Sequence, residues 1–167
     1  GAFFYTDRSE PSPDIQLHFA ISIVDSHGRK IHRYHGYTCH VCVLRPKSRG
    51  TLKLSGSDPS APPLIDPAIL EDEDDMERML KGVLKAQQIM EVPAFDSLRG
   101  EPLYSSGSKD LDVLREDIRN RADTIYHPVG TCKMGNDDMA VVDERLKVRG
   151  LQGLRVADAS IMPIVMS

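Results

Sequence analysis

The residues best suited to chemistry lie in one stretch, 126–135, which reads Tyr-His-Pro-Val-Gly-Thr-Cys-Lys-Met-Gly. Pro128 keeps the backbone of His127 out of the helical region, and the two glycines permit tight turns. A histidine on a stiff, extended support suits general acid–base catalysis, because imidazole titrates near neutral pH. Turn geometry alone also explains a His-Pro pair in a glycine-rich loop, so both interpretations stay open.

Cys39 and Cys42 have the spacing of half a zinc site or of a redox pair. The third cysteine, Cys132, stands alone far downstream, so a second ligand pair is missing from the sequence. In an extended strand, residues three apart face opposite sides of the sheet. We therefore interpret the pair as structural thiols and expect no metal site, with a zinc module as the alternative.

Three other polar stretches have both a functional and a structural interpretation. The basic loop 45–50 could hold a phosphate, or be a solvated connection between strands. The acidic run 71–75 suits a helix N-terminus and needs no metal to explain it. Small residues around Asp158 and Ala159 would let a ligand approach the backbone closely, or would form a simple turn. The remaining histidines have no partner at metal-ligand spacing: His18, His27, His32, His35 and His40.

The first third of the chain has the pattern of strands. Apolar and polar residues alternate from 15 to 23, which predicts a strand over 15–24. Further strands are predicted at 37–44 and 51–54. Their connection is too short for a helical crossover, so we expect them to be antiparallel neighbours. The proline-rich stretch 58–63 should then end the sheet.

Two helices follow. Apolar residues at three- and four-residue steps predict a helix from Glu71 that stops before Pro93. A second helix is predicted over 109–121, with Ser108 as its N-cap. These patterns predict an α+β fold in which an antiparallel sheet is backed by helices. A glycine-rich dinucleotide or phosphate loop is absent from the sequence. Short strands are expected in the last third at 140–142, 146–148 and 154–156.

Composition limits the class of protein. The 167 residues include 21 Lys and Arg against 25 Asp and Glu, a formal net charge of −4. This balance excludes a bulk nucleic-acid binder and an electrostatically driven binder of anionic membranes. Hydrophobic residues at 40% exclude wholesale disorder. The three cysteines fit a reducing compartment. With no signal peptide or membrane-spanning stretch in this sequence, we expect a location in the cytoplasm or at the inner face of a membrane.

The two ends of the chain are unusual. It begins at Gly1 without an initiating methionine and closes on the apolar stretch 161–166. A domain seldom ends on apolar residues unless something further covers them. We therefore expect this chain to be a fragment of a longer protein.

Several motifs follow one another along the chain in a recognisable order. Four lie in the last third, at 124–135, 140–143, 146–150 and 154–163, and two lie earlier, at 13–19 and 44–51. The four later motifs are similar to the C-terminal part of the glucose–methanol–choline (GMC) family of FAD-dependent oxidoreductases, and the two earlier motifs resemble its choline-dehydrogenase-like branch. The resemblance extends from about residue 13 to residue 167.

The resemblance implies both a domain organisation and a set of site residues. Residues 1–167 would be the GMC C-terminal domain, with the substrate-domain sheet and helices at 13–123. The active-site histidine loop and a flavin-adjacent strand would lie at 124–167. His127 matches the histidine that assists removal of the alcohol proton while a hydride passes to FAD. Asp158 and Ala159 match the segment that contacts this cofactor.

Two departures from the family pattern limit what this chain can do alone. The family's FAD fingerprint is missing, and its second catalytic residue, a His or Asn, would lie beyond Ser167. We therefore expect catalysis on a small alcohol only together with the FAD-binding domain of the same protein, and we expect this chain alone to be inactive and to lack a tight FAD site. Membrane association of the full-length enzyme stays open. The alternative is a self-contained, non-catalytic binding or structural α+β domain.

Overall fold

The computed structural model describes residues 1–166, and Ser167 lies outside the described residues. The chain forms two compact units. Unit 1 comprises residues 1–44 and 72–122, and unit 2 comprises residues 45–71 and those from 123 onward. The elements in chain order are β1 (Ala2–Phe4), β2 (Ile15–Ala20), η1 (Ser26–Gly28), β3 (Thr38–Val43), β4 (Thr51–Lys53), β5 (Leu64–Asp66), α1 (Glu73–Met90), η2 (Pro93–Phe95), α2 (Leu111–Arg121) and η3 (Ala159–Ile161).

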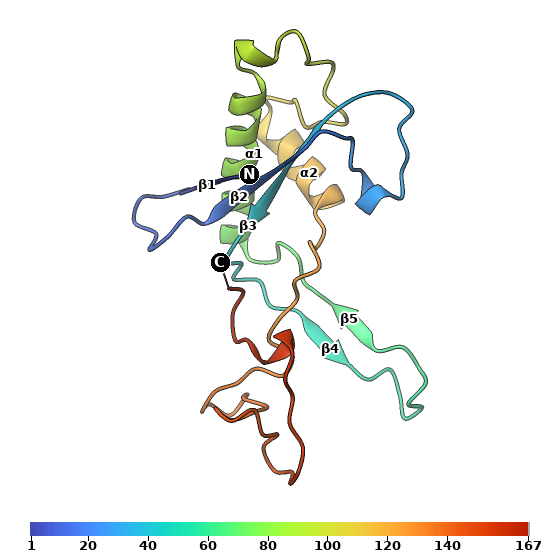
Figure 1. Ribbon diagram of the computed structural model, residues 1–167, viewed down its shortest axis with the longest axis vertical. Helices are drawn as coiled ribbons and strands as arrows, with labels where there is room; N and C mark the ends of the chain where they lie inside the picture. Colours follow the sequence, from blue (N-terminus) through green and yellow to red (C-terminus); the bar gives the residue numbers. More distant parts are fainter. Residues whose placement is uncertain (167) are drawn as a thin grey trace. The chain divides into compact units, whose positions relative to one another are not determined.

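Unit 1 contains a three-stranded antiparallel sheet in the order β1-β2-β3. Its register runs from Ile15 opposite Val43 to Ala20 opposite Thr38. Because side chains alternate along a strand, Ile15 and Leu17 share one face, where they form a buried cluster with Ala86 of α1. Helix α1 packs against β2 and β3, which cross it obliquely in Figure 1, and α2 packs next to α1.

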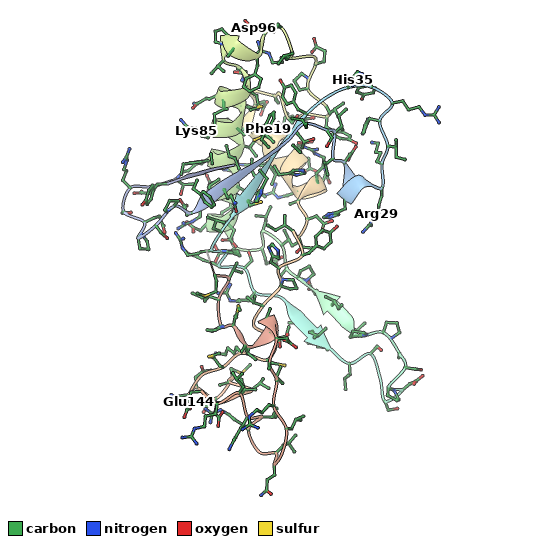
Figure 2. All side chains as sticks on the ribbon, in the orientation of Figure 1. Phe19, Arg29, His35, Lys85, Asp96 and Glu144 are labelled. Atoms are coloured by element: carbon green, nitrogen blue, oxygen red, sulfur yellow. The ribbon has the colours of Figure 1, made fainter. Side chains whose placement is uncertain are left out.

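The strand predicted over 15–24 is correct in position but ends earlier, at Ala20. β3 begins at Thr38 and supplies no partner residue beyond this point. The chain instead turns away, and the Thr38 hydroxyl donates to the Ser22 carbonyl while it accepts from the Val24 N–H. Near this end of β2, the rings of Phe19 and Tyr37 lie 5.5 Å apart, and Phe19 is labelled in Figure 2.

Helix α1 forms where the periodicity predicts it, from Glu73 to Met90, and ends before Pro93. Asp72 is its N-cap and accepts a hydrogen bond from the Asp74 N–H, so the acidic run acts as the start of a helix. Met76 and Leu80 are buried on its inner face.

Helix α2 spans Leu111–Arg121, but the predicted cap at Ser108 is wrong. The Asp110 carboxylate accepts hydrogen bonds from the N–H groups of Asp112 and Val113. The Ser108 hydroxyl, two residues before Asp110, accepts a hydrogen bond from the Asp110 N–H and lies outside the helix. Aspartate at 110 is the residue next to the first helical turn, so its side chain reaches the unpaired amides there.

In unit 2, β4 pairs with β5 in a separate two-stranded antiparallel sheet, with Thr51 opposite Asp66. The expected pairing of the 51–54 strand with the 37–44 strand is therefore wrong. The expected end of the sheet at 58–63 is also wrong, because these prolines lie in the connection between the paired strands and leave the amides of β5 free to pair.

The last third of the chain contains isolated bridges instead of the three short strands predicted there. Val142 bridges both Met134 and Val148, and Lys147 bridges Arg155. Turns with positive φ at Leu146, Gly150 and Gly153 reverse the chain after one or two pairs, so no ladder extends. Val142 is fully buried at the centre of these bridges.

The two antiparallel sheets and two α-helices found in the described part of the chain, residues 1–166, confirm the predicted α+β class. Among the helices formed by residues 1–166, none combines the length and apolar character needed to cross a bilayer.

Candidate functional site

His127 lies in unit 2 on an exposed loop, directly before Pro128. Tyr126, which precedes it, has a φ of 68°. Within residues 1–166 the His127 ring has no hydrogen-bond partner or ion pair. Both ring nitrogens are therefore open to a ligand, as a residue that exchanges a proton with substrate requires.

The loop after His127 is hydrogen-bonded to the segment after Asp158. The Cys132 N–H donates to the Ser160 carbonyl at 3.0 Å, and the Met134 N–H donates to the Ile161 carbonyl at 2.8 Å. The structure thus brings together two clusters that are about 30 residues apart in the sequence.

Gly130 allows this close approach. Its φ is +89°, and a Cβ built at this position would lie 3.5 Å from the Met162 carbonyl oxygen. A side chain here would be strained because of the backbone conformation, whatever the space around it. The glycine therefore lets the histidine loop turn against the 158–162 segment.

Asp158 is the N-cap of η3 and accepts a hydrogen bond from the Ser160 N–H at 2.8 Å. Hydrogen bonds from the Ser160 hydroxyl and backbone N–H lower the pKa of this carboxyl, so it is ionised at neutral pH. Ala157 and Ala159 on either side are exposed. Their small side chains leave the backbone accessible, so the segment fits a place where a flat cofactor approaches the chain.

The family model that describes the GMC oxidoreductases matches residues 46–167. The chain belongs to the GMC oxidoreductase family. The predicted resemblance is therefore confirmed, and the matched range includes His127, Asp158 and Ala159.

Relatives with curated names agree with this GMC assignment. An alcohol dehydrogenase [acceptor] of Pseudomonas putida is 43% identical over 164 residues, which are 98% of this chain and 30% of that protein. An oxygen-dependent choline dehydrogenase of Cronobacter sakazakii is 40% identical over 169 residues, 100% of this chain and 30% of that protein. The chain thus spans about 30% of the length of these relatives.

Solved structures of two oxidases share the fold. A pyridoxine 4-oxidase of Mesorbium loti matches with a TM-score of 0.83 at 29% identity, over 92% of this chain and 30% of that chain. A variant of the Aspergillus oryzae formate oxidase, studied for FAD modification, matches with a TM-score of 0.79 at 26% identity, over 93% of this chain and 28% of that chain.

Cys39 and Cys42 lie on opposite faces of β3, as the spacing predicted. Cys39 packs against the buried cluster, whereas Cys42 is paired with Gln16 across the sheet. Burial raises the pKa of both thiols, so they are protonated and poorly reactive at neutral pH. Within residues 1–166, no three His, Cys, Asp or Glu side chains converge as a metal site would require.

The basic loop 45–50 uses one of its two arginines, Arg49, for internal hydrogen bonds. The Arg49 guanidinium donates to the carbonyls of Pro46 and Ser48 at 2.8 and 2.9 Å. Arg49 therefore closes the loop on itself, which supports the structural interpretation over phosphate binding.

Sequence reasoning missed a polar cluster in unit 1. Asp25 accepts hydrogen bonds from Tyr104 at 2.6 Å and contacts the His32 ring at 2.7 Å. The other His32 ring nitrogen lies 3.1 Å from the Tyr34 hydroxyl, beside an open hollow of about 240 Å³. Tyr104 is 79 residues from Asp25 in the sequence, so no local motif indicated this cluster. Because both nitrogens of His32 are engaged, this ring is held in place and is less suited than His127 to proton exchange.

Proposed function

We propose that this chain is the substrate-side portion of an FAD-dependent GMC enzyme that oxidises the CH–OH group of a small alcohol to a carbonyl. One observation carries the proposal. The loop that presents His127, whose ring has no partner within residues 1–166, is hydrogen-bonded through Cys132 and Met134 to the segment that begins at Asp158. A candidate base and a candidate cofactor-binding segment thus belong to one local structure.

In the proposed reaction, the hydroxyl proton of the alcohol moves to a ring nitrogen of His127 as the C=O bond forms. The hydride leaves the same carbon, and FAD, when bound, supplies its acceptor. Sharing the hydroxyl proton with a base makes the carbon a better hydride donor. Asp158 and Ala159 would hold the cofactor through exposed backbone at η3, as one edge of its site.

The named relatives support an alcohol as the substrate. Both named relatives act on alcohols, choline in one case. We therefore propose a primary or otherwise activated alcohol for the full-length enzyme. Its FAD-binding domain, in the same protein, is the proposed partner of this chain, and we propose that the enzyme works in the cytoplasm or at the inner face of a membrane.

Replacing His127 tests the proposal directly. In the full-length holoenzyme, His127→Ala should slow flavin reduction by alcohol about 100-fold, the scale of a lost acid–base group. The measurement is anaerobic stopped-flow absorbance of the flavin with choline and with aliphatic and aromatic primary alcohols.

His35→Ala is the matched control, because His35, labelled in Figure 2, is an exposed histidine of unit 1, whereas His127 and Asp158 belong to unit 2. This variant should reduce its flavin at the wild-type rate. Near-normal reduction in His127→Ala, with any of the alcohols, would contradict the role of His127.

A further inference from the structure

The residue before His127 has an unfavourable backbone conformation. Tyr126 has a φ of 68°, in the left-handed region that residues with a Cβ rarely adopt. Its side chain is 65% exposed, so burial of the ring does little to stabilise this conformation. A strained residue next to a candidate catalytic group is a reason to ask what holds it there.

Two successive hydrogen bonds hold this turn. The Tyr126 N–H donates to the Thr124 hydroxyl oxygen at 3.0 Å. The Thr124 N–H in turn donates to the Asp123 carboxylate at 2.7 Å. A threonine hydroxyl that binds the amide two residues ahead closes a tight turn without a backbone carbonyl.

The turn limits where the His127 ring can point. Pro128 restricts His127 itself to extended backbone, so the dihedral angles at Tyr126 largely set the direction in which the loop leaves the turn. On the far side, Cys132 is anchored to Ser160. His127 therefore lies between two anchors, one at the Thr124 hydroxyl and one at the 158–162 segment.

We propose that Thr124 is a positioning residue for His127. Its hydroxyl stabilises the left-handed Tyr126 and thereby orients the imidazole for proton transfer. The inference rests on the proposed function of His127, and it adds a residue that acts through the histidine without contacting substrate.

The primary test replaces Thr124 in the full-length holoenzyme. Thr124→Val keeps the shape but removes the acceptor, so flavin reduction should slow about 10-fold, because small misplacements of a catalytic group are costly. The alcohol concentration that gives half the maximal rate of flavin reduction should change less than about twofold, since Thr124 does not bind substrate. Thr124→Ser retains the acceptor and should restore the wild-type rate.

Thr51→Val is the matched control. It makes the same change on an exposed strand residue of unit 2 and should leave flavin reduction unchanged. Because Thr124 is exposed and its hydroxyl supports one local turn, Thr124→Val should lower the melting temperature only slightly. A second test relieves the backbone strain at residue 126 itself. In a Tyr126→Gly background, where glycine adopts positive φ without strain, Thr124→Val should cost less than in the wild type.

A double-mutant cycle separates positioning from general damage. If Thr124 acts through the histidine, Thr124→Val should slow flavin reduction less than about twofold in a His127→Ala background. An equal loss in both backgrounds, or a failure of Thr124→Ser to restore the rate, would overturn the proposal.

The same variants distinguish a failure of the proposed function from a failure of the positioning role. Wild-type reduction in His127→Ala would overturn the proposed function and the positioning role together. Slow reduction in His127→Ala with a wild-type rate in Thr124→Val would overturn the positioning role alone.

Discussion

At the scale of single residues, the contacts of a side chain separate candidates that look alike in the sequence. His32 and His127 are both histidines in irregular segments, yet His32 has both ring nitrogens engaged. The His127 ring has no such partner within the described residues. Two aspartates also differ in their surroundings. The residues on either side of Asp158 are exposed, whereas the Asp25 carboxylate is hydrogen-bonded to Tyr104 and His32.

The role of Asp158 leads to a prediction about cofactor retention. Asp158→Ala in the full-length enzyme removes the acceptor for the Ser160 N–H and should loosen η3, which raises the Kd for FAD about 10-fold. Asp158→Asn keeps a side-chain oxygen and should stay within about threefold of the wild type. The measurement is FAD fluorescence titration of the apoenzyme, and equal Kd values for the two variants would contradict the capping role.

The buried thiols give a pH dependence. The pKa of Cys39 and of Cys42 is raised above the ordinary 9.0 by burial, so both are neutral thiols at pH 7. Native alkylation by iodoacetamide should be slow at pH 7 and should rise as the pH passes 9. Raising the pH should also weaken the fold, since the unfolded thiols ionise first.

Peptide mass spectrometry of each cysteine follows this reaction. Chain unfolded in urea is the control, in which all three cysteines should react rapidly. Rapid native labelling of Cys39 or Cys42 at pH 7 would mean that these thiols are not buried as described.

At the scale of elements, side-chain size sets how closely α1 approaches the sheet. Gly82 faces β2 and β3, and a Cβ built there would lie 2.5 Å from Val41 Cγ1 and 3.3 Å from Ile15 Cγ2. At the N-terminal end of the same helix, Arg78 donates to the buried Asp14 at 2.9 Å. The glycine permits contact, and the ion pair fixes the start of β2 against the helix.

Gly82→Ala should therefore destabilise the protein, although alanine is the better helix former. Overpacking against Val41 costs about 1–3 kcal/mol, while the gain in helix propensity is about 1 kcal/mol. We expect a net loss of up to about 2 kcal/mol in the free energy of unfolding, measured by urea denaturation.

Lys85→Ala is the control for Gly82→Ala, because Lys85 is exposed on the same helix (Figure 2). Its free energy of unfolding should change by less than about 0.5 kcal/mol. A Gly82→Ala variant more stable than the wild type would mean that the helix has room to move away from the sheet.

At the scale of the whole molecule, the chain alternates between two compact units, and the candidate site lies within one of them. Unit 2 has little regular structure and depends on turn hydrogen bonds, isolated bridges and the buried Val142. This chain also spans only about 30% of its named relatives. The residues proposed to contact FAD are therefore one edge of a site whose phosphate-binding loop this sequence does not contain.

We expect the 167-residue chain by itself to bind FAD weakly and to be inactive. Mixed with FAD and choline under anaerobic conditions, it should produce no loss of flavin absorbance over hours. Fluorescence titration should give no saturation at micromolar FAD. Full-length holoenzyme is the control, and stoichiometric FAD binding by the isolated chain would contradict the prediction.

Local patterns account for much of the fold. The strand from Ile15 and the helix from Glu73 were predictable because their apolar residues follow the periods of a strand and a helix. The pairing of β4 was not predicted, because its partner is β5, the next strand along the chain, which gave no strand signal of its own. β1 and β5, at three residues each, are too short to have a detectable period.

For the candidate site, the sequence by itself determined the parts. It placed His127 before a proline, surrounded Asp158 with small residues and carried the motifs of the GMC family. Only the tertiary structure decided that the two segments are joined through Cys132 and Ser160, and that Tyr126 is held in the left-handed region by Thr124. Residue type and local spacing fix what a side chain can do. Its partners depend on the path of the folded backbone, which brings Cys132 to the distant Ser160 and gives the nearby Tyr126 its positive φ, and apolar periodicity does not encode that path.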